Sequence, residues 1–211
     1  MTKTRESRRR DATLNRERLL TAAGATFAES GVNAPLEAIA RRAGVSIGTL
    51  YNHFPSRIAL LDAIYPDRVA ALTETARAAS AVTDPWQAFR GFLIRIFELQ
   101  AADRGLNDAM TQRHPDAPAL SAACDRGFAD VARLLDRARA EGALRDDFDM
   151  TDLAFLIWAT SRVIMATVDV APEAWRRYLD LHLDGLRPEA AHPLPVPPMT
   201  AEQVAAAMRA G

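Results

Sequence analysis

One run of small, polar and basic side chains, from Ser46 to Arg57, has a spacing that suits hydrogen bonding to DNA. Leu50 and Phe54 are four residues apart and would anchor a short helix to an apolar core. The outer side of that helix would then carry Ile47, Gly48, Thr49, Asn52 and His53. A face of small and mostly uncharged side chains suits a helix that lies deep in a major groove.

The preceding residues predict the elements that would position this face. Ile39, Ala40 and Ala43 recur at helical spacing and give a first helix one apolar side. Gly44 follows where helices often end in a left-handed conformation that glycine adopts at little cost. Ser46 can cap the next helix by accepting a backbone hydrogen bond. The pattern predicts a helix-turn-helix with helices at about 36–43 and 47–53.

At this point the sequence resembles a known family. The segment Val45-Ser46-x-Gly48-Thr49-Leu50-Tyr51-x-His53-Phe54-x-Ser56-Arg57-x-x-Leu60 is similar to the signature of TetR-family transcriptional regulators, and the resemblance covers roughly residues 13–65. The chain departs from the family pattern at two places. Arg57 stands where the family usually has lysine, and Pro35-Leu36-Glu37 replaces a threonine-rich start of the second helix.

The resemblance implies how the recognition segment would contact DNA. The residues expected at phosphates are Thr49, Tyr51, His53 and Arg57. The residues expected to face base edges are Ser46, Ile47, Gly48 and Asn52. Phosphate contacts would position the helix, whereas base contacts would specify the sequence. Asn52 would pair with adenine, and Ile47 would contact a thymine methyl group.

The resemblance also implies a ligand pocket between the helices of the C-terminal body. The expected lining combines aromatic side chains with polar groups beside apolar stripes: Phe89, Phe97, Gln100, Asn107, Thr111, Phe128, Trp158 and Arg162. Arg162 lies within an apolar helix, where a full charge needs a partner. That partner would be an acidic ligand, Asp152, Asp169 or a carboxylate of a second subunit.

Helix signals dominate the whole chain, so the expected fold is all-α. We expect a flexible basic arm over residues 1–12 that contains Arg8-Arg9-Arg10 and either enters a minor groove or is solvated. A DNA-binding domain at 13–65 and a regulatory and dimerisation domain at 66–187 follow. The expected helices lie at about 13–30, 56–79 with a break or kink at Pro66, 84–102, 104–112, 119–141, 150–168 and 172–186. Residues 188–211 would form a Pro-rich tail with a short helix after Thr200.

The charge distribution and composition of the chain restrict the functions that it can have. Residues 1–65 hold ten Lys or Arg against six Asp or Glu, and the remainder holds sixteen against twenty-one. A basic end on an acidic body fits a protein that presents one end to phosphates. We expect no disulfide because Cys124 is the single cysteine, and no metal or cofactor because the four histidines are dispersed and no phosphate loop occurs. We also expect no signal peptide and no membrane span, and hence a cytoplasmic protein.

These observations predict a homodimeric transcriptional regulator that binds a palindromic DNA operator. We expect a repressor that a small-molecule effector releases. Control by a partner protein, with Thr200–Ala210 as its handle, is one alternative, and an enzyme on a helical bundle is another. We expect dimerisation through helices 150–168 and 172–186, with Leu179 and Leu183 in the interface.

Overall fold

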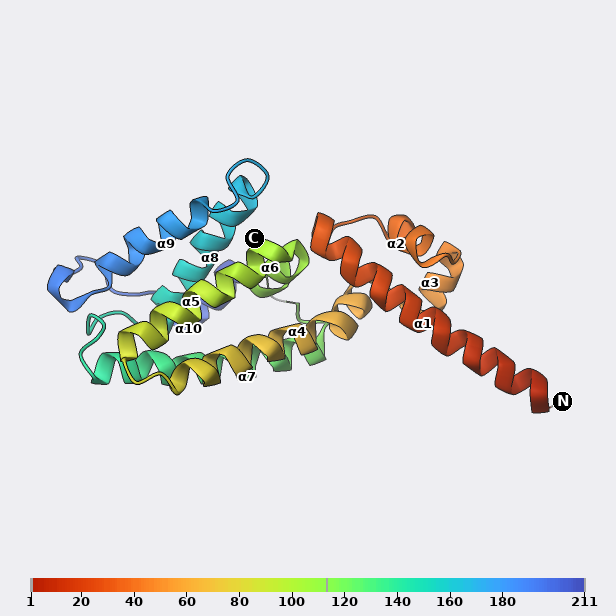
Figure 1. The fold of residues 1–211 in the computed structure, drawn as a ribbon, viewed down its shortest axis with the longest axis horizontal. Coiled ribbons are helices and arrows are strands. Elements are labelled where there is room, and N and C mark those ends of the chain that lie inside the picture. The colour runs from red at the N-terminus through yellow and green to blue at the C-terminus, as the bar shows by residue number, and fades with distance from the viewer. Residues whose placement is uncertain (1, 113, 211) are drawn as a thin grey trace.

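The structure is a computed structural model that describes residues 2–112 and 114–210, and every regular element in this part of the chain is helical (Figure 1). Side chains of residues 2–6, 8, 209 and 210 are not described. The elements are α1 (Thr2–Ser30), α2 (Leu36–Ala43), α3 (Ile47–His53), α4 (Arg57–Ser80), α5 (Pro85–Ala102), α6 (Arg104–Thr111), α7 (Pro118–Ala140), α8 (Met150–Thr167), α9 (Ala174–Gly185), the 3-10 turn η1 (Pro188–Ala190) and α10 (Ala201–Ala210). The predicted all-α fold is confirmed.

The first three helices form a small domain at one end of an elongated molecule (Figure 1). Helix α1 buries Leu19, Ala23 and Phe27 against α2 and the start of α4. Helices α2 and α3 have the predicted bounds. Gly44 adopts the left-handed conformation expected of it, with φ of 71°, and this turn sets the angle between the two helices.

Helix α1 begins eleven residues before the predicted start, so the irregular arm expected over residues 1–12 is helical from Thr2. This stretch contains neither Gly nor Pro, and Arg, Lys and Glu are good helix formers. Thr13, at the predicted start, instead lies within the helix, where its hydroxyl donates to the Arg9 carbonyl at 3.1 Å. Met1 and the side chain of Arg8 lie outside the described residues.

Helix α4 joins this domain to the body. Ser56, at the predicted start of this helix, caps it by accepting from the Ala59 amide at 3.2 Å. Of the two outcomes expected at Pro66, a break is wrong because the helix continues through this residue to Ser80, and a kink stays a prediction. At this position proline removes one backbone hydrogen-bond donor from the helix. Helix α4 packs along α7 over much of its length (Figure 1).

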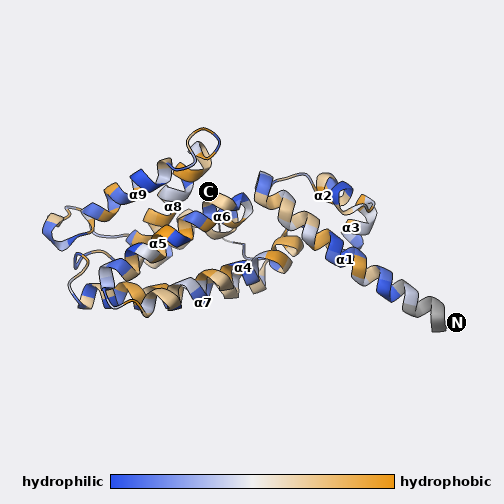
Figure 2. Cartoon of the chain, viewed as in Figure 1, coloured by the Kyte–Doolittle hydropathy of each residue, from blue (hydrophilic) through white to orange (hydrophobic). Residues whose placement is uncertain are grey.

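In the body, α5 packs against α4, α7 and α8, and α9 packs against α8. Hydrophobic and hydrophilic residues alternate along the helices of the body (Figure 2), and apolar residues of α5 such as Phe92, Leu93 and Ile96 are buried. The α9 stripe of Trp175, Leu179 and Leu183 is at most 1% exposed. Leu179 and Leu183 are therefore committed to the core of the protomer, and the expectation that they form a subunit interface is wrong.

The C-terminal segment follows the predicted organisation. Residues from Ala191 to Thr200 have no regular secondary structure apart from a bend, and they lead into the short helix α10. Thr200 and Gln203 form a capping box at its start: the Thr200 hydroxyl accepts from the Gln203 amide at 3.2 Å, and the Gln203 side chain accepts from the Thr200 amide at 2.8 Å. Helix α10 packs on α8. None of the described helices is long and apolar enough to cross a membrane. Gly211 lies outside the described residues.

Candidate DNA-binding surface and ligand pocket

The recognition helix α3 is held from below by two apolar anchors. Leu50 is fully buried and Phe54 is 2% exposed. The guanidinium of Arg16, in α1, lies over the Phe54 ring with its carbon 5.0 Å from the ring centroid. At the other end of the helix, Ser46 accepts from the Thr49 amide at 3.1 Å. These contacts fix which face of α3 points outward.

The outward face contains the predicted DNA-binding residues together. Ser46, Gly48, Tyr51 and Asn52 are exposed, and Ile47, Thr49 and His53 are half-buried. The Ser46 and Thr49 hydroxyls lie 2.9 Å apart and share a hydrogen bond. Both hydroxyls are thus partly used within the helix cap, whereas the exposed side chains of Tyr51 and Asn52 remain available to a ligand of this face. Their contacts with DNA stay a prediction.

Arg57 has a role that the sequence did not indicate. Its Nη1 atom donates to the carbonyls of Val32 and Ala34, at 2.5 Å each. These carbonyls lie in the loop that connects α1 to α2. Arg57 is therefore a half-buried clamp between the start of α4 and that loop, in addition to any phosphate contact.

The body contains a pocket with a cavity volume of about 80 Å³. This is several times the roughly 10–15 Å³ that one water-sized group requires. Its walls come from α4, α5, α6, α7, α8 and α10, through these residues: Val69, Leu72, Thr73, Phe92, Ile96, Met110, Thr111, Cys124, Gly127, Phe128, Val131, Met150, Leu153, Ala154, Phe155, Ile157, Trp158, Val204 and Met208. The lining has no charged side chain, so it suits an apolar ligand.

The two threonines of the lining offer little free hydrogen-bonding capacity. Thr73 donates to the Val69 carbonyl at 3.5 Å, and Thr111 donates to the Asn107 carbonyl at 2.9 Å. Each hydroxyl can still accept a hydrogen bond from a ligand.

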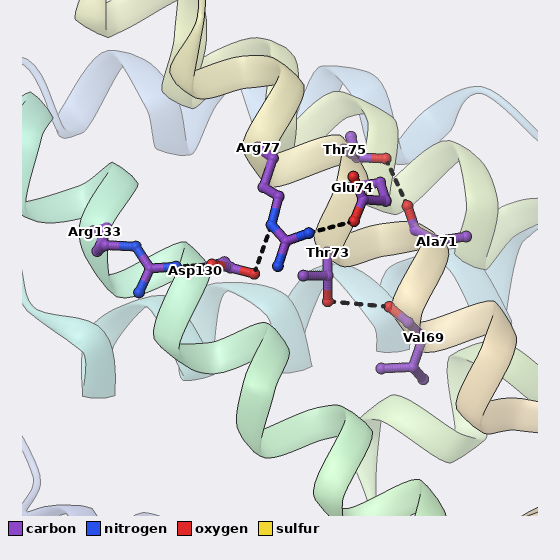
Figure 3. A network of polar contacts seen from close by, with 8 residues as sticks. All are labelled: Val69, Ala71, Thr73, Glu74, Thr75, Arg77, Asp130 and Arg133. Atoms are coloured by element: carbon purple, nitrogen blue, oxygen red, sulfur yellow. Dashed lines mark hydrogen bonds and ion pairs between the residues drawn. The ribbon is translucent and has the colours of Figure 1, made fainter.

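A buried carboxylate near Thr73 connects α7 to α4: Asp130 pairs with Arg77 at 3.7 Å and also with Arg133 (Figure 3).

Three of the eight predicted ligand residues line this pocket: Thr111, Phe128 and Trp158. Phe89 and Phe97 do not, because their rings are fully buried against Phe148 and Trp175, with centroids 6.3 Å and 6.0 Å apart. These two assignments are wrong for the pocket described here. Aromatic residues at helical spacing serve the core at these positions.

The polar candidates lie behind or away from the pocket. Gln100 is fully buried, where its Oε1 accepts from the Ser161 hydroxyl at 3.0 Å and its Nε2 donates to the Met110 sulfur at 3.6 Å. Asn107 is also buried, and its Oδ1 has no partner among the described atoms. Arg162 is exposed. The expectation of a buried charge at Arg162 is therefore wrong, because that side of α8 faces outward.

The sequence did not predict the pocket residues of α4 and α10, nor those of α7 other than Phe128. Val69, Leu72 and Thr73 lie on the inner side of α4, and Met208 lies in the C-terminal tail. Their apolar periodicity places them on a buried face but does not separate a pocket wall from ordinary core. The chain had no local signal for which helices meet around the cavity.

A polar junction connects the pocket wall to the DNA-binding domain. The Asp108 carboxylate, in α6, accepts from the Val32 amide at 2.9 Å. Burial raises the pKa of Asp108, and the Val32 bond opposes that rise. Nearby Arg68, in α4, pairs with Asp103 at the start of α6. Asp108 is two residues from Met110, which lines the pocket, so α6 contacts both the pocket and the loop before α2.

Two further properties of the described residues bear on chemistry. They contain no group of three or more His, Cys, Asp or Glu side chains placed to hold a metal ion. Burial lowers the pKa of His114, in the loop after α6, although the Asp108 carboxylate acts in the opposite direction. Its Nε2 atom is buried without a hydrogen-bond partner among the described atoms.

Comparison with known proteins matches both halves of the chain to transcriptional regulators. Residues 19–64 match the family described as bacterial regulatory proteins of the tetR family. Residues 84–188 match the description "Transcriptional regulator SbtR-like, C-terminal domain". The two matches correspond to the small N-terminal domain and to the body that encloses the pocket.

Individual relatives extend over most of the chain. The TetR transcriptional regulator SCO0520 from Streptomyces coelicolor is 33% identical, with 82% of this chain and 98% of that one covered at a TM-score of 0.54. The HTH-type transcriptional repressor KstR of Mycolicibacterium smegmatis is 29% identical over 176 residues, which is 79% of this chain and 83% of that protein. The fold also resembles FadR from Bacillus subtilis in complex with stearoyl-CoA, at 17% identity, a TM-score of 0.60, and 81% and 99% coverage.

Proposed function

The chain belongs to the TetR family of transcriptional regulators, and from this premise we propose that it is a homodimeric repressor released from a palindromic operator by a lipophilic small molecule. Regulators of this family are not enzymes, so the helical-bundle enzyme considered from the sequence is ruled out. KstR, the relative at 29% identity, is itself named a repressor, which supports repression here.

The DNA-binding part of the proposal rests on the outward face of α3. Asn52 and Tyr51 are exposed beside one another, on a helix whose cap and anchors fix its orientation. We propose that Ser46, Ile47, Gly48 and Asn52 face base edges, and that Thr49, Tyr51, His53 and Arg57 contact phosphates. Arg57 would use the nitrogens that do not donate to the α1–α2 loop.

Dimerisation would use the outer side of α8 and α9. Leu181 is 62% exposed on α9, which packs against α8. A large apolar side chain on the outer side of this helix supports coverage by a second subunit. A two-fold dimer would present two α3 helices to successive major grooves, about 34–36 Å apart.

The ligand class follows from the pocket lining. With two threonine hydroxyls and no charged side chain, the cavity would bind a neutral, largely apolar group. The FadR complex supplies a fold-level precedent for a ligand with a long acyl chain, although its identity to this chain is low. Six helices contribute to the lining of the cavity, which supports a small-molecule ligand.

The single observation that carries the release mechanism is the position of α6. Met110 and Thr111 line the pocket, and Asp108 of the same helix binds the Val32 amide beside the DNA-binding domain. A ligand that displaces α6 would alter this contact and with it the angle of α1–α3. Release then requires that the ligand and the operator favour different states, each through its own differential affinity.

Selection of bound fragments from genomic DNA tests the proposal. We expect a palindromic site, and we expect neutral apolar compounds to release the protein from it when they bind the cavity. A matched set of charged, polar compounds serves as the control and should have no effect. Recovery of fragments without a shared palindrome would contradict the dimeric operator, and binding of apolar compounds without any release would contradict the repressor mechanism.

A further inference from the structure

We infer that the C-terminal helix α10 is a displaceable cover of the pocket, held in the place that part of a lipophilic effector would occupy. The inference rests on the proposed function, because it takes the cavity to be the effector site. It adds that an intramolecular segment competes with the effector for the same apolar walls.

The contact is made by one side of α10. Val204 and Met208 are four residues apart, so they lie on the same face of the helix. Both side chains line the cavity and both are half-buried, whereas Glu202 and Ala206 are exposed. Val204 and Met208 thus complete an apolar wall that also contains Phe155 and Trp158 of α8.

The helix itself is weakly supported. It has ten residues, and helices of this length are marginal in water without tertiary contacts. The segment before it contains Pro193, Pro195, Pro197 and Pro198, with Leu194 and Val196 exposed at 58% and 72%. Arg145 holds the start of this segment by donating to the His192 carbonyl at 2.8 Å. The following residues therefore form a tether that can stay in place while α10 leaves.

The part of the pocket wall formed by α4 and α7 is more firmly built than the part formed by α10. There α4 and α7 pack along one another, and the buried Asp130 pairs with Arg77 across the seam (Figure 3). A ligand that needs more room than the cavity offers would meet less resistance at α10 than at α4 and α7. Displacement of Val204 and Met208 would also expose to the ligand the apolar surface that they now cover.

Cys124 provides a direct readout, because it is the single cysteine of the chain and it lines the cavity from α7. The full-length protein and the double variant Val204→Ser with Met208→Ser would be treated with a small thiol reagent. A second double variant, Glu202→Ser with Ala206→Ser, is the control, because it alters exposed positions of the same helix and loses at least as much helix propensity.

We expect Cys124 to react about fivefold faster in the Val204/Met208 variant than in the wild type and the control, because the population with α10 displaced rises. Equal rates in all three proteins would overturn the inference. This readout requires no effector, so it can fail while the proposed function stands. Circular dichroism checks folding, and the single variant Met208→Ser replaces the double variant if that one loses helical content.

Binding of a neutral apolar fluorophore, N-phenylnaphthylamine, gives the second readout. If α10 competes with the ligand, the Val204/Met208 variant should bind the probe about fivefold more tightly than the control variant. Weaker binding would show that α10 is part of the ligand's own wall and would overturn the inference. If no variant binds the probe, the proposed lipophilic effector is contradicted. The rate of Cys124 modification would then be the only test of whether α10 covers the pocket.

Discussion

The DNA-binding domain and the body differ in how far apart in the chain the residues of each site lie. The outward face of α3 is built from residues within a span of eight, from Ser46 to His53, and its cap and anchors are in the same segment. The pocket is built from six helices between Val69 and Met208. Local sequence therefore determines the first site, whereas the second depends on how distant helices pack.

This difference has consequences for substitutions. In α3, a single change alters a cap or a contact and leaves its neighbours in place. In the body, one face of a helix is buried in the core, whereas the adjacent face of the same helix is exposed. Adjacent positions of the body should therefore respond very differently to the same substitution.

The largest effect is expected in α9. Leu179→Glu places a charge at a position that is 1% exposed, and it should destabilise the body by about 4 kcal/mol or more. Leu181→Glu changes a side chain that is 62% exposed and should leave thermal unfolding nearly unchanged. If the outer face of α9 forms the dimer, Leu181→Glu should sediment as a folded monomer. A stable Leu181→Glu dimer would place the interface elsewhere, and equal stability of both variants would contradict the burial described here.

Arg57→Ala should produce the next largest loss of stability. The substitution leaves the Val32 and Ala34 carbonyls without their donor, and bonds to a charged group are worth about 1.5–3 kcal/mol, so we expect a loss of about 2 kcal/mol. If Arg57 also contacts a phosphate, the log–log salt dependence of DNA binding should fall by roughly one unit. Thermal unfolding and titrations at several salt concentrations measure the two roles separately. Unchanged stability would contradict the clamp, and an unchanged salt dependence would remove the phosphate contact.

Two serine caps provide a smaller and more closely matched comparison. Ser46 caps α3 and Ser56 caps α4, through bonds of 3.1 Å and 3.2 Å to the third amide of each helix. Each change to alanine should cost about 1 kcal/mol of stability. Only Ser46→Ala should also weaken operator binding selectively, because α3 carries the DNA-facing side chains. Equal effects of the two variants on DNA affinity would argue against a special position for α3.

The smallest effect concerns acid stability of the loop after α6. Because burial lowers the pKa of His114, the neutral ring stabilises the fold above its ordinary pKa of 6.5, and this stability is lost as the pH falls. The contribution is at most about 1.4 kcal/mol per pH unit for one proton. His114→Gln should therefore flatten the fall in melting temperature between about pH 7 and pH 5. An identical pH dependence in the variant would assign the acid sensitivity to other groups, such as Glu98, whose pKa is lowered by its hydrogen bond with Arg176.

The sequence predicted the fold well because most helix boundaries carry local signals. Gly44, Ser46, Ser56 and Asp149 end or cap helices where expected, since each acts through its own backbone or side chain. The prediction of a flexible arm over residues 1–12 failed for the opposite reason: a stretch without helix breakers gives no signal for where α1 begins. Local chemistry thus marks where a helix is stopped more clearly than where it can extend.

The candidate pocket was predicted less well for a physical reason. Aromatic residues such as Phe89 and Phe97 have the same periodicity as Phe128 and Trp158, and only the packing of distant helices separates core from cavity. Arg162 lies within an apolar helix, but its exposure depends on whether any helix covers that face. No pattern within α8 contains this information.

Titration of the selected operator with the wild type, Asn52→Ala and Tyr51→Phe tests the central claim most directly. Asn52→Ala should lose about 1–3 kcal/mol of preference at one base-pair position, because an amide that pairs with a base edge reads that position alone. Tyr51→Phe should weaken binding about equally to operator and mismatched DNA, as expected for a phosphate contact. A uniform loss for Asn52→Ala across all single-base operator variants would contradict sequence readout by the outward face of α3.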